Sequence, residues 1–148
     1  MESESMGRDG NELLASNLSP RFLEMALRTD RCLPMERPDG RGKKTGVCGD
    51  TVEFNIVVER GILKTLTYQV EGCLHTNACA NALISLVEGR PVEEVWEILP
   101  EAVAERLETL PDDHFHCAEL AVGALFLALA DAQHRARNPV RKIYGRSR

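Results

Sequence analysis

Two runs of alternating apolar and polar residues, joined by a short turn, most strongly constrain the fold of this chain. The first run covers residues 52–58 and the second covers 65–70, and in each run every second side chain is apolar. Glu59-Arg60-Gly61 provides a turn between them. Alternation with a period of two is typical of strands that bury one face. The sequence therefore predicts an antiparallel β-hairpin.

Helical patterns surround this hairpin on both sides. Helix-capping residues, prolines and apolar residues at helical spacing mark several segments. The expected segments are a helix from Ser19-Pro20 to about Arg28, an apolar helix closing at Gly89, a helix from Pro91 that Pro100 ends, a short helix carrying Val103 and Leu107, and a long apolar helix over about 118–134. An order of helix, hairpin and further helices favours an α+β fold. We expect a small antiparallel sheet, the hairpin with room for a third strand, packed by four to six helices.

The remaining segments lack periodicity. Residues 32–47 are rich in proline, glycine and basic side chains, which predicts a mobile loop. Residues 1–18 are polar and predict a flexible N-terminal arm, and residues 135–148 predict a basic, solvated tail. We therefore expect one domain over residues 19–134.

Charge and hydropathy exclude some classes of partner. The net charge of −5 argues against a nucleic-acid partner bound through its phosphates. The longest apolar run, 118–130, is shorter than a membrane-spanning helix, and the start of the chain lacks the pattern of a secretory signal. We expect a cytoplasmic protein, in which five cysteines favour metal ligation or thiol chemistry over disulfides.

Three cysteines, one aspartate and one histidine stand at the ends of the predicted elements. Cys73 follows Cys48 by 25 residues and precedes Cys117 by 44, a spacing too wide for a local zinc finger. Thiolates, imidazoles and carboxylates ligate zinc, and thiolates hold iron-sulfur clusters. The five candidate ligands are Cys48, Asp50, Cys73, His116 and Cys117.

The expected topology brings these side chains together. Cys48 precedes the first strand of the hairpin and Cys73 follows the second, and both points lie at the same end of an antiparallel pair. The long helix can bring Cys117 to that end. A helix N-terminus favours a thiolate, so Cys117 is the best candidate nucleophile. The alternative is that the thiols are apolar fillers and Asp50 is a turn cap.

Several other residues have simpler interpretations. Cys79 lies on an apolar helix and is expected in the core, whereas Cys32 is expected to be exposed. His75 is either exposed, hydrogen-bonded at a helix start, or close to a ligand set, and we expect His114 and His134 at the surface. The basic residues at 41, 43 and 44 are expected to be solvated, with an acidic partner as the alternative.

The chain resembles the N-terminal type of the IscU/NifU iron-sulfur cluster assembly scaffolds, with a SufE/NifU-like fold. The resemblance covers about residues 19–134 and is carried by four short motifs in the order typical of the family. These motifs are Val47-Cys48-Gly49-Asp50, Glu71-Gly72-Cys73, Glu88-Gly89-Arg90-Pro91 and His116-Cys117-Ala118.

The resemblance implies a scaffold and carrier that is not an enzyme. Persulfide sulfur would come from a cysteine desulfurase, with Cys117 as acceptor, and electrons from a donor such as a ferredoxin. A transient 2Fe-2S cluster would form on the cysteines and pass to apo-proteins. Asp50 would be the labile ligand and His116 an alternative one, and zinc or iron would bind at the same site. A monomer or weak homo-oligomer is expected.

The chain also departs from the family pattern. Leu110-Pro111-Asp112 stands where well-known members carry Leu-Pro-Pro-Val-Lys, the motif that a dedicated chaperone recognises, so that partner is in doubt. Leu74-His75-Thr76 replaces a run of small residues, which adds an imidazole near the cluster. Because no CxxC motif follows in this sequence, we expect a protein other than full-length NifU. The alternative functions are a zinc-bound protein that relays persulfide sulfur and a purely structural zinc domain.

Overall fold

The computed structural model of the chain describes residues 18–137. The arm predicted before residue 18 and the tail predicted beyond residue 137 lie outside the described residues. Within them the structure has three strands, five α-helices and one 3-10 turn, which confirms the predicted α+β class.

The sheet is fully antiparallel, with the strand order β1-β2-β3. Its strands are β1 (Gly40–Thr45), β2 (Thr51–Glu59) and β3 (Ile62–Glu71). The predicted hairpin is β2-β3, and Arg60 and Gly61 at its turn have φ angles of 54° and 78°. Two successive residues with positive φ form the turn that best matches the twist of a hairpin. This explains why a glycine stands at the second position.

Strand β1 forms within the segment that the sequence predicted as a mobile loop, so that prediction is wrong. Gly40 and Gly42 are the buried positions of the strand, and a side chain at either would overlap the backbone of helix α6 (Phe115–Arg137). The strand therefore buries backbone instead of apolar side chains. This leaves no alternation of apolar residues for sequence reasoning to detect.

The helices follow the predicted order with some changes at their ends. Ser19 caps the first helix, as predicted, because its hydroxyl accepts a 3.0 Å hydrogen bond from the amide of Phe22. Pro100 begins a helix instead of ending one, and the final helix extends to Arg137 instead of ending near residue 134. The helices before α6 are α2 (Pro20–Leu27), α3 (Leu74–Val87), α4 (Val92–Val95), α5 (Pro100–Leu107) and the 3-10 turn η2 (Asp112–His114).

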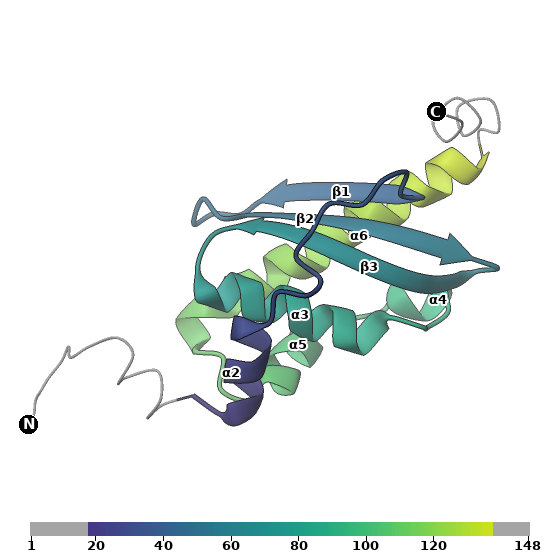
Figure 1. The fold of residues 1–148 in the computed structure, drawn as a ribbon. Helices are drawn as coiled ribbons and strands as arrows, with labels where there is room; N and C mark the ends of the chain where they lie inside the picture. The colour runs from purple at the N-terminus through teal and green to yellow at the C-terminus, as the bar shows by residue number, and fades with distance from the viewer. Residues whose placement is uncertain (1–17, 138–148) are drawn as a thin grey trace, which may run out of the picture.

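The helices gather on one side of the sheet (Figure 1), with α6 packed along β1 and β2. By length and composition alone, the segment Asp112–Arg137 is apolar enough to cross a membrane, a test that buried core helices also pass. Half of its most apolar window is buried in this fold. Burial in the core therefore accounts for the apolar character of α6.

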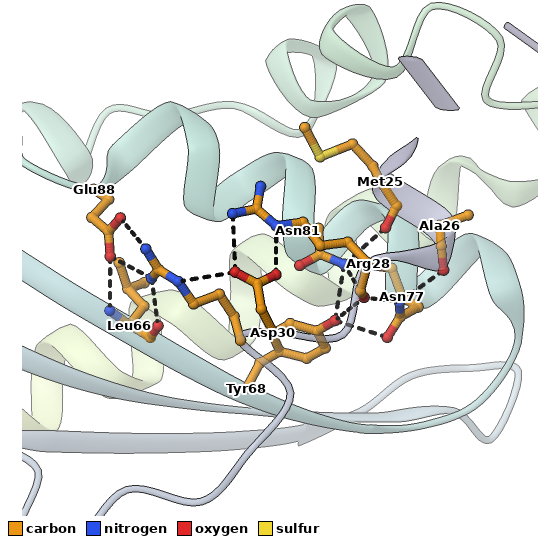
Figure 2. A network of polar contacts seen from close by, with 10 residues as sticks. Met25, Ala26, Arg28, Asp30, Leu66, Tyr68, Asn77, Asn81 and Glu88 are labelled. Atoms are coloured by element: carbon orange, nitrogen blue, oxygen red, sulfur yellow. Dashed lines mark hydrogen bonds and ion pairs between the residues drawn. The ribbon is translucent and has the colours of Figure 1, made fainter. Parts of the chain in front are cut away.

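A polar network joins α2, α3 and β3 (Figure 2). The side-chain amide of Asn81 donates to the carbonyl of Met25 at 2.8 Å and to the Tyr68 hydroxyl at 2.9 Å. The amide of Asn77 donates to the carbonyls of Ala26 and Arg28 at 2.9 Å and 3.2 Å. These bonds satisfy carbonyls at the end of α2 that have no partner within the helix.

Candidate metal centre

Three connections meet at one end of the sheet. Strand β1 ends and β2 begins where Thr45 pairs with Thr51, and β3 ends where Thr51 pairs with Glu71. Figure 1 shows the β1-β2 turn, the β3-α3 connection and the start of α6 at this same end. The register therefore brings together the segments that carry Cys48, Cys73 and Cys117, as the topology predicts.

Asp50, Cys73 and Cys117 form the centre of this site. One ligand atom from each lies within 4.8 Å of the other two. Their burial differs: the Cys73 side chain is exposed, Asp50 is half-buried and Cys117 is fully buried. Two sulfurs and a carboxylate at this spacing can ligate one metal ion or one edge of a cluster. The donor set therefore fits both zinc and an iron-sulfur cluster.

Thr76 links the three ligands, and sequence reasoning did not identify it. Its hydroxyl donates to Asp50 Oδ2 at 2.6 Å and lies 3.3 Å from Cys117 Sγ and 3.6 Å from Cys73 Sγ. The Thr76 hydrogen bond, followed by one from the Cys73 amide, lowers the pKa of Asp50. The carboxylate is therefore ionised at neutral pH and available as a ligand.

Gly72 leaves the space that Asp50 occupies. A Cβ atom at residue 72 would lie 2.5 Å from both Cγ and Oδ2 of Asp50. Such a contact is far inside van der Waals distance, so a larger residue would displace the carboxylate. The Glu71-Gly72-Cys73 motif thus contains glycine because any side chain at this position would collide with the Asp50 carboxylate.

Cys117 differs from its predicted chemistry. Helix α6 begins at Phe115, directly after η2, so Cys117 is the third residue of the helix instead of standing before it. Burial raises the pKa of Cys117 to about 11, against the smaller lowering effect of the Thr76 hydroxyl. Without a metal this sulfur is a buried thiol at neutral pH, and not the activated thiolate that the sequence suggested.

Cys48 and His116 lie outside the set of three. The Cys48 thiol is exposed in the β1-β2 turn and is one of the hydrogen-bonding groups that lower the pKa of Asp50, so it reaches that carboxylate. His116 is half-buried and lines a shallow pocket with Lys44 and Glu119. Their roles as ligands stay predictions.

A row of rings lies beside the centre. His75 stacks on His114 with 3.7 Å between ring centroids, and Phe22 contacts the His75 ring edge-on at 5.5 Å. His116 continues the row at 6.0 Å from His114. Burial, and then the charge of His114, lower the pKa of His75, so its ring is neutral at pH 7.

The predictions for the remaining cysteines and histidines have mixed outcomes. Cys79 is buried, and its burial raises its pKa well above the usual range, so its place in the core is confirmed. Cys32 is exposed, as predicted. His114 is not a simple surface residue, because its side chain is only 31% exposed and stacks on His75. Helical spacing gives no signal for a contact between two segments so far apart in sequence.

Comparison with known proteins identifies the family. The model of the NifU-like N-terminal domain matches residues 36–139. The iron-sulfur cluster assembly scaffold protein IscU 1 of Archaeoglobus fulgidus is 34% identical over 98 residues, which are 66% of this chain and 64% of that protein. The IscU scaffold protein of Azotobacter vinelandii is 33% identical over 89 residues, 60% of this chain and 69% of that protein. The match thus spans somewhat under two thirds of the Archaeoglobus relative.

Solved structures show the same fold at low sequence identity. The N-terminal NifU-like protein of Brucella abortus has a TM-score of 0.66 and 18% identity, covering 82% of this chain and 98% of that one. A putative scaffold protein for the SUF system from Fervidobacterium islandicum has a TM-score of 0.64 and 14% identity, covering 77% and 97%. Together with the match over residues 36–139, the predicted resemblance is confirmed, and the chain belongs to the NifU-like N-terminal domain family.

Proposed function

We propose that this protein is a scaffold on which an iron-sulfur cluster is assembled and from which it passes to apo-proteins. The observation that carries the proposal is the convergence of Asp50, Cys73 and Cys117 at one end of the sheet, with Cys48 in reach of Asp50. Relatives that are named as cluster assembly scaffolds support it.

The mixed donor set suits a cluster that must leave. Sulfur ligands hold iron strongly, whereas a carboxylate is a harder and weaker donor to the iron of a cluster. Asp50 is ionised and is in reach of both the exposed Cys48 and the buried Cys117. The proposed cargo is a transient 2Fe-2S cluster. We assign Cys48, Asp50, Cys73 and Cys117 as its ligands, with His116 as an alternative to Asp50. Zinc or a single iron ion would occupy the same set.

The sulfur would come from a cysteine desulfurase and the electrons from a donor such as a ferredoxin. Cys117 remains the proposed persulfide acceptor under one condition. Its sulfur is buried in the metal-free fold, so sulfur transfer requires the site to open, which also removes the burial that raises the pKa of the thiol. The exposed Cys73, at the start of α3, is the accessible alternative. We propose that the chain acts as a cytoplasmic carrier and not as an enzyme.

Anaerobic reconstitution tests this function. The chain is incubated with ferrous iron, cysteine and a cysteine desulfurase, and the charge-transfer absorption of the cluster is recorded. The native chain should develop this chromophore, and Cys73→Ser should lose most of it. Cys32→Ser is the matched control, because Cys32 is equally an exposed cysteine but lies outside the site.

Two outcomes would contradict the proposal. Persulfide on a cysteine with zinc retained and no chromophore would indicate a sulfur relay. Equal chromophore yields from Cys73→Ser and Cys32→Ser would show that the cluster does not depend on this site.

A further inference from the structure

A second group of possible metal ligands adjoins the proposed cluster site. Ligand atoms of Cys73, His75 and His114 all lie within 4.8 Å of one another. The group combines the first turn of α3 with the 3-10 turn η2 before α6. We propose that this set binds one divalent transition-metal ion, zinc or ferrous iron, and that the ion competes for Cys73 with the Asp50 set.

The distance between the first two ligands fits a tetrahedral ion. Cys73 Sγ lies 3.8 Å from His75 Nδ1. Zinc bound to one sulfur and one imidazole nitrogen at ordinary bond lengths places those atoms about 3.6 Å apart. An ion therefore enters between the sulfur and the ring with a shift of only a few tenths of an ångström, by this estimate.

The ring stack brings the third ligand to the same point. His75 and His114 have ring centroids 3.7 Å apart and planes inclined by 20°. Two imidazole nitrogens on one tetrahedral ion lie about 3.3 Å apart. An imidazole binds an ion in the plane of its ring, so these nearly parallel rings must tilt apart before both nitrogens reach a single ion.

A carboxylate orients the third ligand. His114 Nδ1 lies 3.1 Å from Asp113 Oδ1, so this nitrogen carries the proton and donates it to the carboxylate. The lone pair is then on Nε2. Metal-binding histidines commonly donate their other ring N–H to a carboxylate in this way, which fixes the ring and strengthens the ligand. Asp113 thus favours the tautomer of His114 that leaves Nε2 free to bind an ion.

The chemistry of the set selects the ion. One thiolate and two imidazoles are donors that suit zinc and ferrous iron more than magnesium or calcium. The exposed Cys73 and the half-buried rings leave the set open to solvent, so an ion can enter and a water can complete the tetrahedron.

Shared use of Cys73 has a consequence that rests on the proposed function. If the Asp50 set holds the cluster, an ion on the histidines withdraws one cluster ligand. Zinc at this set would then inhibit cluster assembly.

Cobalt titration tests the site without any cluster chemistry. Co²⁺ replaces zinc and gives sulfur charge-transfer and tetrahedral ligand-field bands. The background is Cys48→Ser with Cys117→Ser, which leaves Cys73 as the sulfur of either set. We expect one Co²⁺ per chain, and His75→Ala or His114→Ala should each weaken its binding by at least about 10-fold. Cys32→Ser and His134→Ala are the controls, because they change an exposed cysteine and an exposed histidine outside both sets, and they should leave the affinity unchanged. Loss of binding in the controls, or full binding without His75 and His114, would overturn the proposal.

Zinc binding provides a second measurement in the same Cys48→Ser, Cys117→Ser background, because in the native chain the proposed cluster ligands would take the first zinc ion. Imidazole ¹⁵N resonances are followed as zinc is added to one equivalent. The signals of His75 Nδ1 and His114 Nε2 should shift, and those of His116 and His134 should not. A shift of His116 alone, or of no histidine, contradicts the site. Neither readout requires a desulfurase, so a failure here is distinct from a failure of cluster reconstitution.

Discussion

Two stretches of helix α3 use their polar side chains in different ways. In the second and third turns, Asn77 and Asn81 donate to backbone carbonyls at the end of α2 and to the Tyr68 hydroxyl. In the first turn, Cys73 and His75 lie 3.8 Å apart, a distance at which an ion fits between them. The asparagines are fixed by backbone partners, whereas the first turn brings together groups that can exchange one partner for a metal.

The difference separates stability from function along one helix. A buried hydrogen bond to a backbone carbonyl stabilises only the folded state, and its loss leaves a buried group unsatisfied. A thiol or imidazole near solvent contributes little to folding but supplies a ligand. Changes in the asparagine stretch should therefore alter stability alone, and changes around the first turn should alter metal binding alone.

The largest effect is expected from Asn81→Leu. The leucine has the same number of side-chain heavy atoms and the same branching but leaves the Met25 carbonyl and the Tyr68 hydroxyl without their donor. We expect the free energy of unfolding to fall by about 2–4 kcal/mol, measured by urea denaturation. Ser85→Ala, at an exposed position of α3, should change it by less than about 0.5 kcal/mol.

The same Asn81→Leu variant also tests whether the two stretches are independent. Where it is folded, its cluster chromophore should match that of the native chain. A lost chromophore in folded protein would show that the asparagine network also positions the ligands.

An intermediate effect is expected from Gly72→Ala. The added methyl group would meet the Asp50 carboxylate at 2.5 Å and displace it from the ligand set. Zinc affinity should fall by about 10- to 100-fold, measured by chelator competition in a His75→Ala, His114→Ala background. The free energy of unfolding should change by less than about 1 kcal/mol, because the backbone of Gly72 does not require glycine.

Gly46→Ala is the matched control for the Gly72 variant. A methyl group at Gly46 meets only the flexible end of Leu120, at 3.2 Å. Equal zinc affinities for the two alanine variants would mean that the Asp50 carboxylate is not a ligand.

Sequence reasoning recovered the parts of this molecule that depend on local patterns. The hairpin followed from alternating side chains, and the Ser19 cap followed from a side chain that bonds three residues along the chain. The convergence of Asp50, Cys73 and Cys117 followed from their positions at element ends, whereas ligation by Cys48 stays a prediction. The resemblance to a known family added the proposed cargo, which no local pattern contains.

The missed features depend on contacts between distant segments. Strand β1 has glycines on its buried face, where α6 packs against the backbone, so its sequence resembles a loop. Thr76 gains its role from Asp50 and Cys117, and His114 gains its role from His75. Likewise, the raised pKa of Cys117 comes from the depth at which α6 is buried, which the sequence of its first turn does not specify.

The smallest effect is expected from removing the ion pair between Arg31 and Glu88. Both nitrogens at the end of the Arg31 side chain contact the Glu88 carboxylate, at 2.5 Å and 2.7 Å, and both side chains are only about a quarter exposed. The hydrogen bond from Arg31 is the main reason that the pKa of Glu88 is lowered from 4.5. A carboxylate with a lowered pKa in the fold stabilises the protein above its unfolded pKa, and this stabilisation is lost as the pH falls through the folded value.

Glu88→Gln should therefore reduce the free energy of unfolding by about 1 kcal/mol at pH 7. The deficit relative to the native chain should shrink as the pH falls below 4.5, because the native Glu88 then becomes protonated and its stabilisation disappears. Urea denaturation between pH 3 and pH 7, on the order of one unit per step, measures this difference. Glu94→Gln is the control, since Glu94 is 60% exposed and lies 3.8 Å from Arg90, so its removal should have almost no effect at any pH. A deficit for Glu88→Gln that stays constant with pH would mean that the side chain stabilises the fold by its shape and neutral hydrogen bonds, and that charge has no part in holding this region together.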